Sequence, residues 1–187
     1  TFPELLAWIK AQPKGVSIAN YSAGTASHLM GVVLAREAGI ELNHVSYRGA
    51  PPATTDLIAG QLPLMFTGLS VSYAQLKAGA VRPYGVAAAR RSELLPDVPT
   101  FAELGFPKVE GSSWMALWTQ PQVPTAIQER LRQEIDKALA RPDVIERFRN
   151  MGTSPSRGAN AEGLARAIAR EHEQTGALLR SIGYKPE

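Results

Sequence analysis

The chain has 187 residues, of which 44% are hydrophobic and 20% are charged, as in a soluble globular protein of one ordinary domain or two small ones. It contains no cysteine, which excludes disulfides, thiol nucleophiles and thiolate metal sites, and no apolar run approaches the roughly 18 residues of a membrane span. The net charge of +3 comes from basic residues that mostly alternate with acidic ones, which favours a solvated surface over a nucleic-acid-binding stripe.

The first half of the chain is predicted to alternate between helices and strands. Helices are expected at residues 3–11, 27–38, 53–59 and 71–77, and strands at residues 16–20, 43–47, 64–67 and 82–88. Thr1 and Glu4 have the spacing of an N-terminal cap, and Gly39 and Gly60 follow two of the helices as C-terminal caps. Residues 48–52 are expected to form a turn. The buried side of the first helix is expected to carry Leu5, Leu6, Trp8 and Ile9. The repeated strand–loop–helix order predicts an α/β sheet with parallel neighbouring strands.

The second half is predicted to hold one strand and several helices. Thr100 is expected to cap a short helix that ends at Gly105, and residues 111–118 are expected to form a strand. Longer helices are expected at residues 124–140, 143–151 and 160–182. Because three helices cannot cover one strand and make a stable sheet alone, this half is expected to belong to a domain whose other strands lie outside this chain.

Loops of small residues follow three of the predicted strands, at residues 22–27, 48–51 and 67–70. Right-handed crossovers place every such loop at one edge of the sheet, where ligands bind in open α/β sheets, so we expect a small-molecule site there. The helix that follows the first loop directs unpaired N–H groups and a positive dipole end at an anion. The chain lacks the Gly-Lys-Ser/Thr ending and the G-x-G-x-x-G pattern of nucleotide sites, so a small carboxylate is a better candidate than a pyrophosphate.

Several polar side chains at these loops have an ordinary structural role beside a binding role. Ser22, Thr25 and Ser27 are typical helix caps, and a cap can also bind an anion. His28 is expected to be a satisfied histidine at a helix start rather than a ligand donor or an acid–base group. Arg48 is a candidate for bidentate carboxylate pairing and equally for a surface arginine at the rim of the site.

No catalytic residue, metal ligand or cofactor is predicted. The loops hold no carboxylate, the 3 histidines lie on different predicted elements, and the chain lacks the G-x-S-x-G pattern of hydrolases. Hydrolysis by Ser22 with His28 is the form that an enzymatic activity would take, and it is the weaker alternative. For Trp114 and Trp118, a hinge or core role is favoured over ligand stacking.

Five segments occur in an order and spacing that resemble the substrate-binding receptors of tripartite tricarboxylate transporters, often called Bug receptors. These segments are Asn20–Leu29, Val45–Pro52, Asp56–Phe66, Arg91–Thr100 and Ser113–Trp114. The resemblance implies an α/β fold of the periplasmic-binding-protein type II kind, with one near-complete Rossmann-like lobe and the C-terminal part of a second lobe. Residues 1–107 would be the ligand-binding lobe 2. Residues 108–187 would cross over into lobe 1, which lacks its N-terminal strands.

The resemblance also implies a function. The expected protein is a periplasmic receptor, exported by a signal peptide outside this chain, that captures a small organic carboxylate and delivers it to membrane transporter subunits. The residues of this chain that match the family's ligand contacts are Ser22, Ala23, Gly24, Thr25, Ser27, Arg48, Gly49, Ala50 and Thr67. Thr67 stands where many members have an aspartate that often meets a ligand's amine, so its presence favours a plain carboxylate over an amino acid.

Two further expectations follow from the same residues. The alternative function is the ligand-sensing effector domain of a transcription regulator, which has a related two-lobed fold and would require a DNA-binding helix-turn-helix upstream.

The chain by itself is expected to expose apolar surface at residues 114–117 and on its final helices. It is therefore expected to associate with itself or to swap elements.

Overall fold

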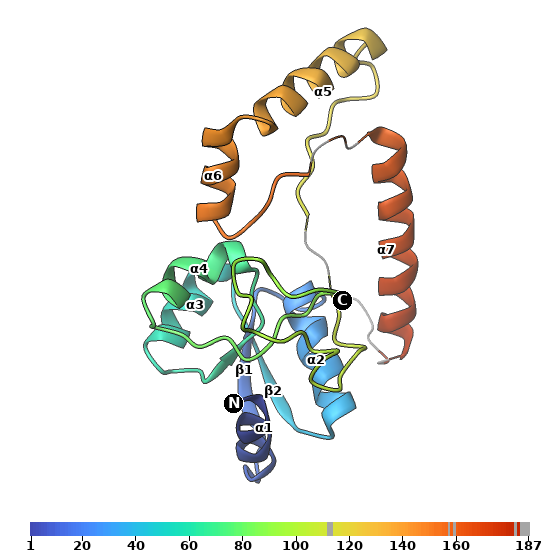
Figure 1. Ribbon diagram of the computed structural model, residues 1–187. Coiled ribbons are helices and arrows are strands. Elements are labelled where there is room, and N and C mark those ends of the chain that lie inside the picture. Colours follow the sequence, from blue (N-terminus) through green and yellow to red (C-terminus); the bar gives the residue numbers. More distant parts are fainter. Residues whose placement is uncertain (112–113, 157, 159, 182, 184–187) are drawn as a thin grey trace. The chain divides into compact units, whose positions relative to one another are not determined.

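The computed structural model describes residues 1–111, 114–156, 158, 160–181 and 183 (Figure 1). The chain divides into two compact units, Thr1–Trp114 and Met115–Glu187, and each is described here by itself. The first unit is an α/β structure, and the second consists of helices and connecting segments.

A parallel sheet of β1 (Val16–Asn20), β2 (Leu42–Ser46) and β3 (Leu64–Met65) forms the centre of the first unit. The strand order is β2-β1-β3, so β1 pairs on both sides. The pairing with β2 runs from Val16 opposite Leu42 to Asn20 opposite Ser46, and Ile18 lies opposite Leu64 of β3. The predictions of three parallel strands with these approximate bounds are confirmed.

Two helices connect the strands, α2 (Ala26–Ala38) and α3 (Ala50–Ile58), while α1 (Phe2–Lys10) precedes β1 and α4 (Leu69–Lys77) follows β3. The predicted cap of α1 is confirmed, because Thr1 Oγ1 accepts the Glu4 N–H at 3.4 Å and the Glu4 carboxylate accepts the Thr1 N–H at 2.7 Å. Gly39 ends α2 in a left-handed conformation, with φ 61°.

The alternating side chains of β1 separate two small cores. Val16 and Ile18 pack with Ile9 of α1, and the half-buried Ala35 of α2 lies against the same cluster. Ala19 faces the other way and packs with Ala53 of α3. The helices α2 and α3 therefore cover opposite faces of the sheet, as Figure 1 shows.

The structure corrects several predictions in the first unit. The turn expected at residues 48–52 ends at Gly49, because α3 begins at Ala50 and takes Pro51 and Pro52 into its first turn, where a missing N–H costs nothing. The strand expected at residues 82–88 is absent. Val86 makes an isolated parallel bridge to Thr100 instead, and Pro83 has no N–H for a longer ladder. Trp8, expected on the buried side of α1, is 44% exposed.

Residues 101–105 form turns in place of the expected short helix, although the cap at Thr100 is present. Thr100 Oγ1 accepts the Glu103 N–H at 3.1 Å, and the Glu103 carboxylate accepts the Thr100 N–H at 2.7 Å. The cap therefore closes a single turn.

The second unit contains α5 (Thr125–Leu139), α6 (Pro142–Asn150) and α7 (Ala161–Ser181), close to the predicted bounds. The strand expected at residues 111–118 is absent from Gly111 and from Trp114–Trp118, while residues 112 and 113, and residue 182 of the last predicted helix, lie outside the described residues. No residue described on these three helices is buried. Among the described helices of the chain, none has the length and apolar character needed to cross a membrane.

Candidate functional site

The strand order reverses direction at β1, which creates a topological switch point at one end of the sheet. From β1 the chain crosses to β2 on one side, and from β2 it returns past β1 to β3 on the other side. The connecting helices α2 and α3 lie on opposite faces, so the connections diverge between β1 and β3. Open α/β sheets bind ligands at the carboxyl ends of the strands where the order reverses in this way. The loops at this point are residues 21–25 and 66–68.

Three helices begin at this carboxyl edge. Their N-cap residues are Thr25 for α2, Gly49 for α3 and Gly68 for α4, and none of the three makes a side-chain cap hydrogen bond. The first N–H groups of a helix carry partial positive charge and have no partner within the helix. Because Pro51 and Pro52 of α3 have no N–H, the backbone donors at this edge come mainly from the starts of α2 and α4, and such donors suit an anion.

Tyr21 joins the three loops to one another. Its backbone carbonyl accepts the Gly49 N–H at 3.3 Å, at the exit of β2. Its hydroxyl hydrogen-bonds to Thr67 Oγ1 and accepts the Gly68 N–H at 3.3 Å, at the exit of β3. One residue at the end of the central strand therefore fixes the two neighbouring loops relative to its own.

The loop after β1 is closed by its own hydroxyl groups. Thr25 Oγ1 donates to the Ser22 carbonyl at 2.7 Å, and Ser27 Oγ accepts the Tyr21 N–H at 3.0 Å. The hydroxyls of Thr25 and Ser27 lie 3.1 Å apart. Since the Thr25 hydroxyl donates its proton to the Ser22 carbonyl, Ser27 is the donor between the two hydroxyls. Both hydroxyl protons are thus used inside the loop, and the groups facing outward are the backbone and the exposed Ser22.

His28 supports the same loop from the first turn of α2. Its Nδ1 accepts the Gly24 N–H at 3.1 Å, which places the ring proton of a neutral imidazole on Nε2. The ring meets His44 of β2 edge to face, with 4.7 Å between the ring centres. Burial lowers the pKa of both histidines below the ordinary 6.5, and the neighbouring His28 lowers the pKa of His44 further. The expectation that His28 is satisfied at a helix start agrees with this geometry.

The exit of β2 contributes backbone and one exposed cation. Arg48 is exposed and makes no ion pair within the described part of the chain. Gly49 has φ 101°, a conformation that favours glycine, and Ala50 is the first residue of α3. Close by in sequence, Asp56 accepts a hydrogen bond from the Tyr47 hydroxyl at 2.7 Å, and this bond raises the pKa of Tyr47. The carboxylate is therefore already engaged by a tyrosine of the same unit.

The structure brings the predicted residues of all three loops to one edge, although Arg48 stands exposed at its border. Sequence reasoning missed Tyr21, whose position directly after β1 was the available signal. It also missed Asn20, the last residue of β1, which is completely buried. Asn20 Oδ1 accepts the Ser46 hydroxyl at 3.0 Å, whereas its Nδ2 has no hydrogen-bond partner among the residues that the structure describes.

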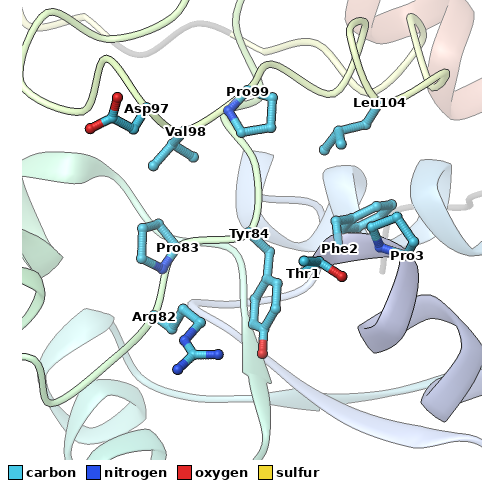
Figure 2. A pocket seen from close by; sticks show the side chains of 10 residues that line it. All are labelled: Thr1, Phe2, Pro3, Arg82, Pro83, Tyr84, Asp97, Val98, Pro99 and Leu104. Atoms are coloured by element: carbon cyan, nitrogen blue, oxygen red, sulfur yellow. The ribbon is translucent and has the colours of Figure 1, made fainter.

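A hollow of about 280 Å³ lies elsewhere in the first unit, around the N-terminus of α1 (Figure 2). Its mostly apolar wall includes Phe2, Pro83 and Leu104, and its charged side chains are Arg82 and Asp97. No residue of the three loops lines it. Across the residues that the structure describes, no group of His, Asp and Glu side chains could hold a metal ion.

Comparison with known proteins places this geometry in a family. The model of the tripartite tricarboxylate transporter family receptor matches residues 1–184. The UPF0065 protein in the tcbD-tcbE intergenic region of Pseudomonas sp. strain P51 is 37% identical over 177 residues, which are 94% of this chain and 52% of that protein.

Solved structures agree. R. palustris Rpa4515, solved with adipate, has a TM-score of 0.91 and 26% identity, covering 100% of this chain and 62% of that one. The periplasmic binding protein BugD has a TM-score of 0.88 and 29% identity, covering 99% of this chain and 62% of that one. The chain spans about half the length of most of the curated relatives it matches.

Proposed function

The chain belongs to the tripartite tricarboxylate transporter receptor family, and from this membership we propose that it is part of a solute-binding receptor that captures a small organic carboxylate. The family is one of receptors and not of enzymes. The observation that carries the proposal is the meeting of three helix N-termini without side-chain caps at one edge of the sheet.

The ligand's carboxylate is held mainly by backbone donors. Ser22, Ala23 and Gly24 lie at the tip of the loop after β1, and Ser22 adds an exposed hydroxyl. Thr25 and Ser27 hold the loop closed, Arg48, Gly49 and Ala50 form the border on the β2 side, and Thr67 lies on the β3 side. Each hydrogen bond to a charged acceptor contributes about 1.5–3 kcal/mol, so two or three support micromolar binding after the costs of ordering.

The setting proposed for the receptor is the periplasm, where it delivers its ligand to transporter subunits in the membrane. Support comes from the family and from the name of BugD as a periplasmic binding protein. That R. palustris Rpa4515 was solved with adipate supports a dicarboxylate as the ligand class. Residues 1–107 serve as the ligand-binding lobe in this proposal, and residues 108–187 return to the other lobe.

A glycine substitution tests the proposed site. Gly24 has φ 77°, so Gly24→Ala strains the loop and displaces the N–H held by His28. Gly39→Ala is the matched control, because Gly39 has φ 61° at the opposite end of α2 and open space around a Cβ. We expect calorimetry of the full-length receptor with organic acids, adipate among them, to show at least roughly thirtyfold weaker binding for Gly24→Ala alone, about the loss of one charged hydrogen bond.

Two results would count against the proposal. Unchanged affinity in Gly24→Ala would remove the loop after β1 from the site. Binding of no organic acid by the unsubstituted receptor would overturn the function itself.

A further inference from the structure

We propose that His44, in the middle of β2 and outside the three loops, is a positioning residue for the ligand: its ring holds the His28 ring against the Gly24 amide and so fixes the tip of the loop after β1. This inference rests on the proposed function, because that loop is part of the proposed site. It goes beyond that function in giving a strand residue outside the loops a role in binding.

The register of the sheet places His44 on the face that α2 covers. His44 lies opposite Ile18 of β1, and the side chains of paired residues in neighbouring strands stand on the same face of a sheet. Ile18 packs in the cluster that Ala35 of α2 joins. The His44 ring is therefore held between β2 and α2.

Gly31 of α2 makes room for this ring. A Cβ built on Gly31 would lie 2.8 Å from His44 Cε1, and Gly31 has no left-handed φ, so the position calls for a missing side chain and not for an unusual backbone. His44 Nδ1 is buried without a hydrogen-bond partner among the described residues. Packing, and not a hydrogen bond of that nitrogen, therefore holds the ring in place.

The position of the His44 ring reaches the loop through His28. The two rings meet edge to face, with 4.7 Å between their centres and 83° between their planes. His28 Nδ1 accepts the Gly24 N–H at 3.1 Å. A half-turn of the His28 ring would put a C–H group in the place of Nδ1, and the His44 ring packed against it obstructs that rotation.

A fixed Gly24 matters for binding because of its place in the loop. It directly follows Ser22 and Ala23, the exposed tip that the proposed site directs at the ligand. Backbone donors that are already ordered bind more tightly than donors that must be ordered when the ligand arrives. Loss of the His44 ring should therefore weaken binding although it removes no donor from the site.

Calorimetry of the full-length receptor tests the inference, with adipate or the organic acid that the receptor binds most tightly as the probe. His44→Ala should weaken binding by about twofold to tenfold, the worth of an edge-to-face contact. His28→Leu removes the acceptor and should weaken binding by about tenfold. His28→Asn should bind more tightly than His28→Leu, because its amide oxygen can take the place of Nδ1.

Gly31→Ala disturbs the same ring from the side of α2 and serves even if His44→Ala fails to fold. The added methyl group must displace the His44 ring, so binding should weaken although alanine favours a helix. In the His44→Ala background the same change should have no effect. Gly176→Ala in α7 is the matched control, because its Cβ would meet the flexible end of Arg180 at 3.4 Å.

A measurement without ligand separates positioning from a general loss of stability. The amide proton resonance of Gly24 should move in His44→Ala and in Gly31→Ala, since its hydrogen bond to His28 changes. A variant that is merely less stable keeps this resonance in place. The double variant His28→Leu with His44→Ala should bind as tightly as His28→Leu alone.

The outcomes distinguish this inference from the proposed function. Unchanged affinity in His44→Ala or in Gly31→Ala would overturn the inference, as would an unmoved Gly24 resonance or equal losses in His28→Asn and His28→Leu. The function would still stand if Gly24→Ala weakened binding. Failure of the unsubstituted receptor to bind adipate or any other organic acid would overturn both.

Discussion

The two units of the chain are stabilised in different ways. In the first unit a central strand is buried between helices, and Ile18 is only 3% exposed. In the second unit none of the residues described on α5, α6 and α7 is buried, and Ile127 of α5 is 51% exposed. Backbone donors hold a fixed position for a ligand only where packing fixes the backbone. The carboxyl edge of the sheet in the first unit meets this condition.

The ion pairs of α5 are local in sequence. Arg132 of α5 pairs with Glu129 at 2.7 Å and with Asp136 at 2.9 Å, and the Arg132 hydrogen bonds lower the pKa of Glu129 to about 2. Such pairs on one helix stabilise it only slightly. Several apolar side chains of this unit are exposed: Met115 is 94% exposed, Leu117 72% and Trp118 62%. The helices α5, α6 and α7 therefore have no fully buried side chain among their described residues.

The largest expected difference is in the free energy of unfolding. Ile18→Ala removes a buried side chain between two packed layers and should destabilise the first unit by about 2–5 kcal/mol. Ile127→Ala is the matched substitution in the second unit and should change stability by less than about 0.5 kcal/mol. Urea unfolding followed by circular dichroism measures both. Equal losses would show that the exposed side of α5 is buried in solution and that the contrast is wrong.

The next largest effect concerns self-association of the 187-residue chain, which stays a prediction. Replacing Met115 and Leu117 together by lysine should weaken self-association by about tenfold or more, since each apolar side chain buried in a contact contributes about 1.5–3 kcal/mol. Light scattering across a concentration series measures this. Val71→Lys, at a position 36% exposed on α4, is the control and should have little effect. A chain that is monomeric at every concentration would contradict the prediction.

The smallest effect is a dependence of stability on pH in the first unit. Because burial lowers the pKa of His28 below 6.5, the unfolded chain binds protons more readily than the folded one. The contribution of neutral His28 to the free energy of unfolding is therefore fully present above pH 6.5. It is lost as the pH falls through that value toward the lower pKa of His28 in the folded chain. His44, whose pKa is lowered in the same direction, adds to the loss.

Asparagine substitutions isolate the contribution of His28. Melting temperatures measured from pH 7.5 to 5 should fall less for His28→Asn than for the unsubstituted chain. His172→Asn, at an exposed position of α7, should leave the fall unchanged. If the melting temperature falls by the same amount in His28→Asn and His172→Asn, protonation of His28 is not the cause of the fall.

Local signals account for most of the fold that could be predicted. The cap at Thr1, the helix end at Gly39 and the strand at residues 16–20 depend on neighbouring residues, and the structure confirms all three. The strands expected at residues 82–88 and 111–118 depend on distant partners, which a sequence pattern does not contain. One reduces to the Val86–Thr100 bridge, and the other is absent from its described residues.

The candidate site shows the same division. The small residues after β1 and the helix start at Ala26 could be predicted from their order in the chain. The contact between Tyr21 and Thr67 could not, because it joins residues 46 positions apart and exists only once β3 lies beside β1. The internal hydrogen bonds of Thr25 and Ser27 likewise required their geometry. Hydroxyl groups can be located from a sequence, but the direction of their protons cannot.

The order β2-β1-β3 has a consequence during protein synthesis. The ribosome delivers β1 and β2 first, and the third strand, which completes the sheet, is available only after Met65 has emerged. Until then one side of β1 presents unpaired backbone groups, and strands with free edges readily join the strands of other nascent molecules. A translational pause before residue 64 would therefore prolong the interval in which this side of β1 is open to such pairing.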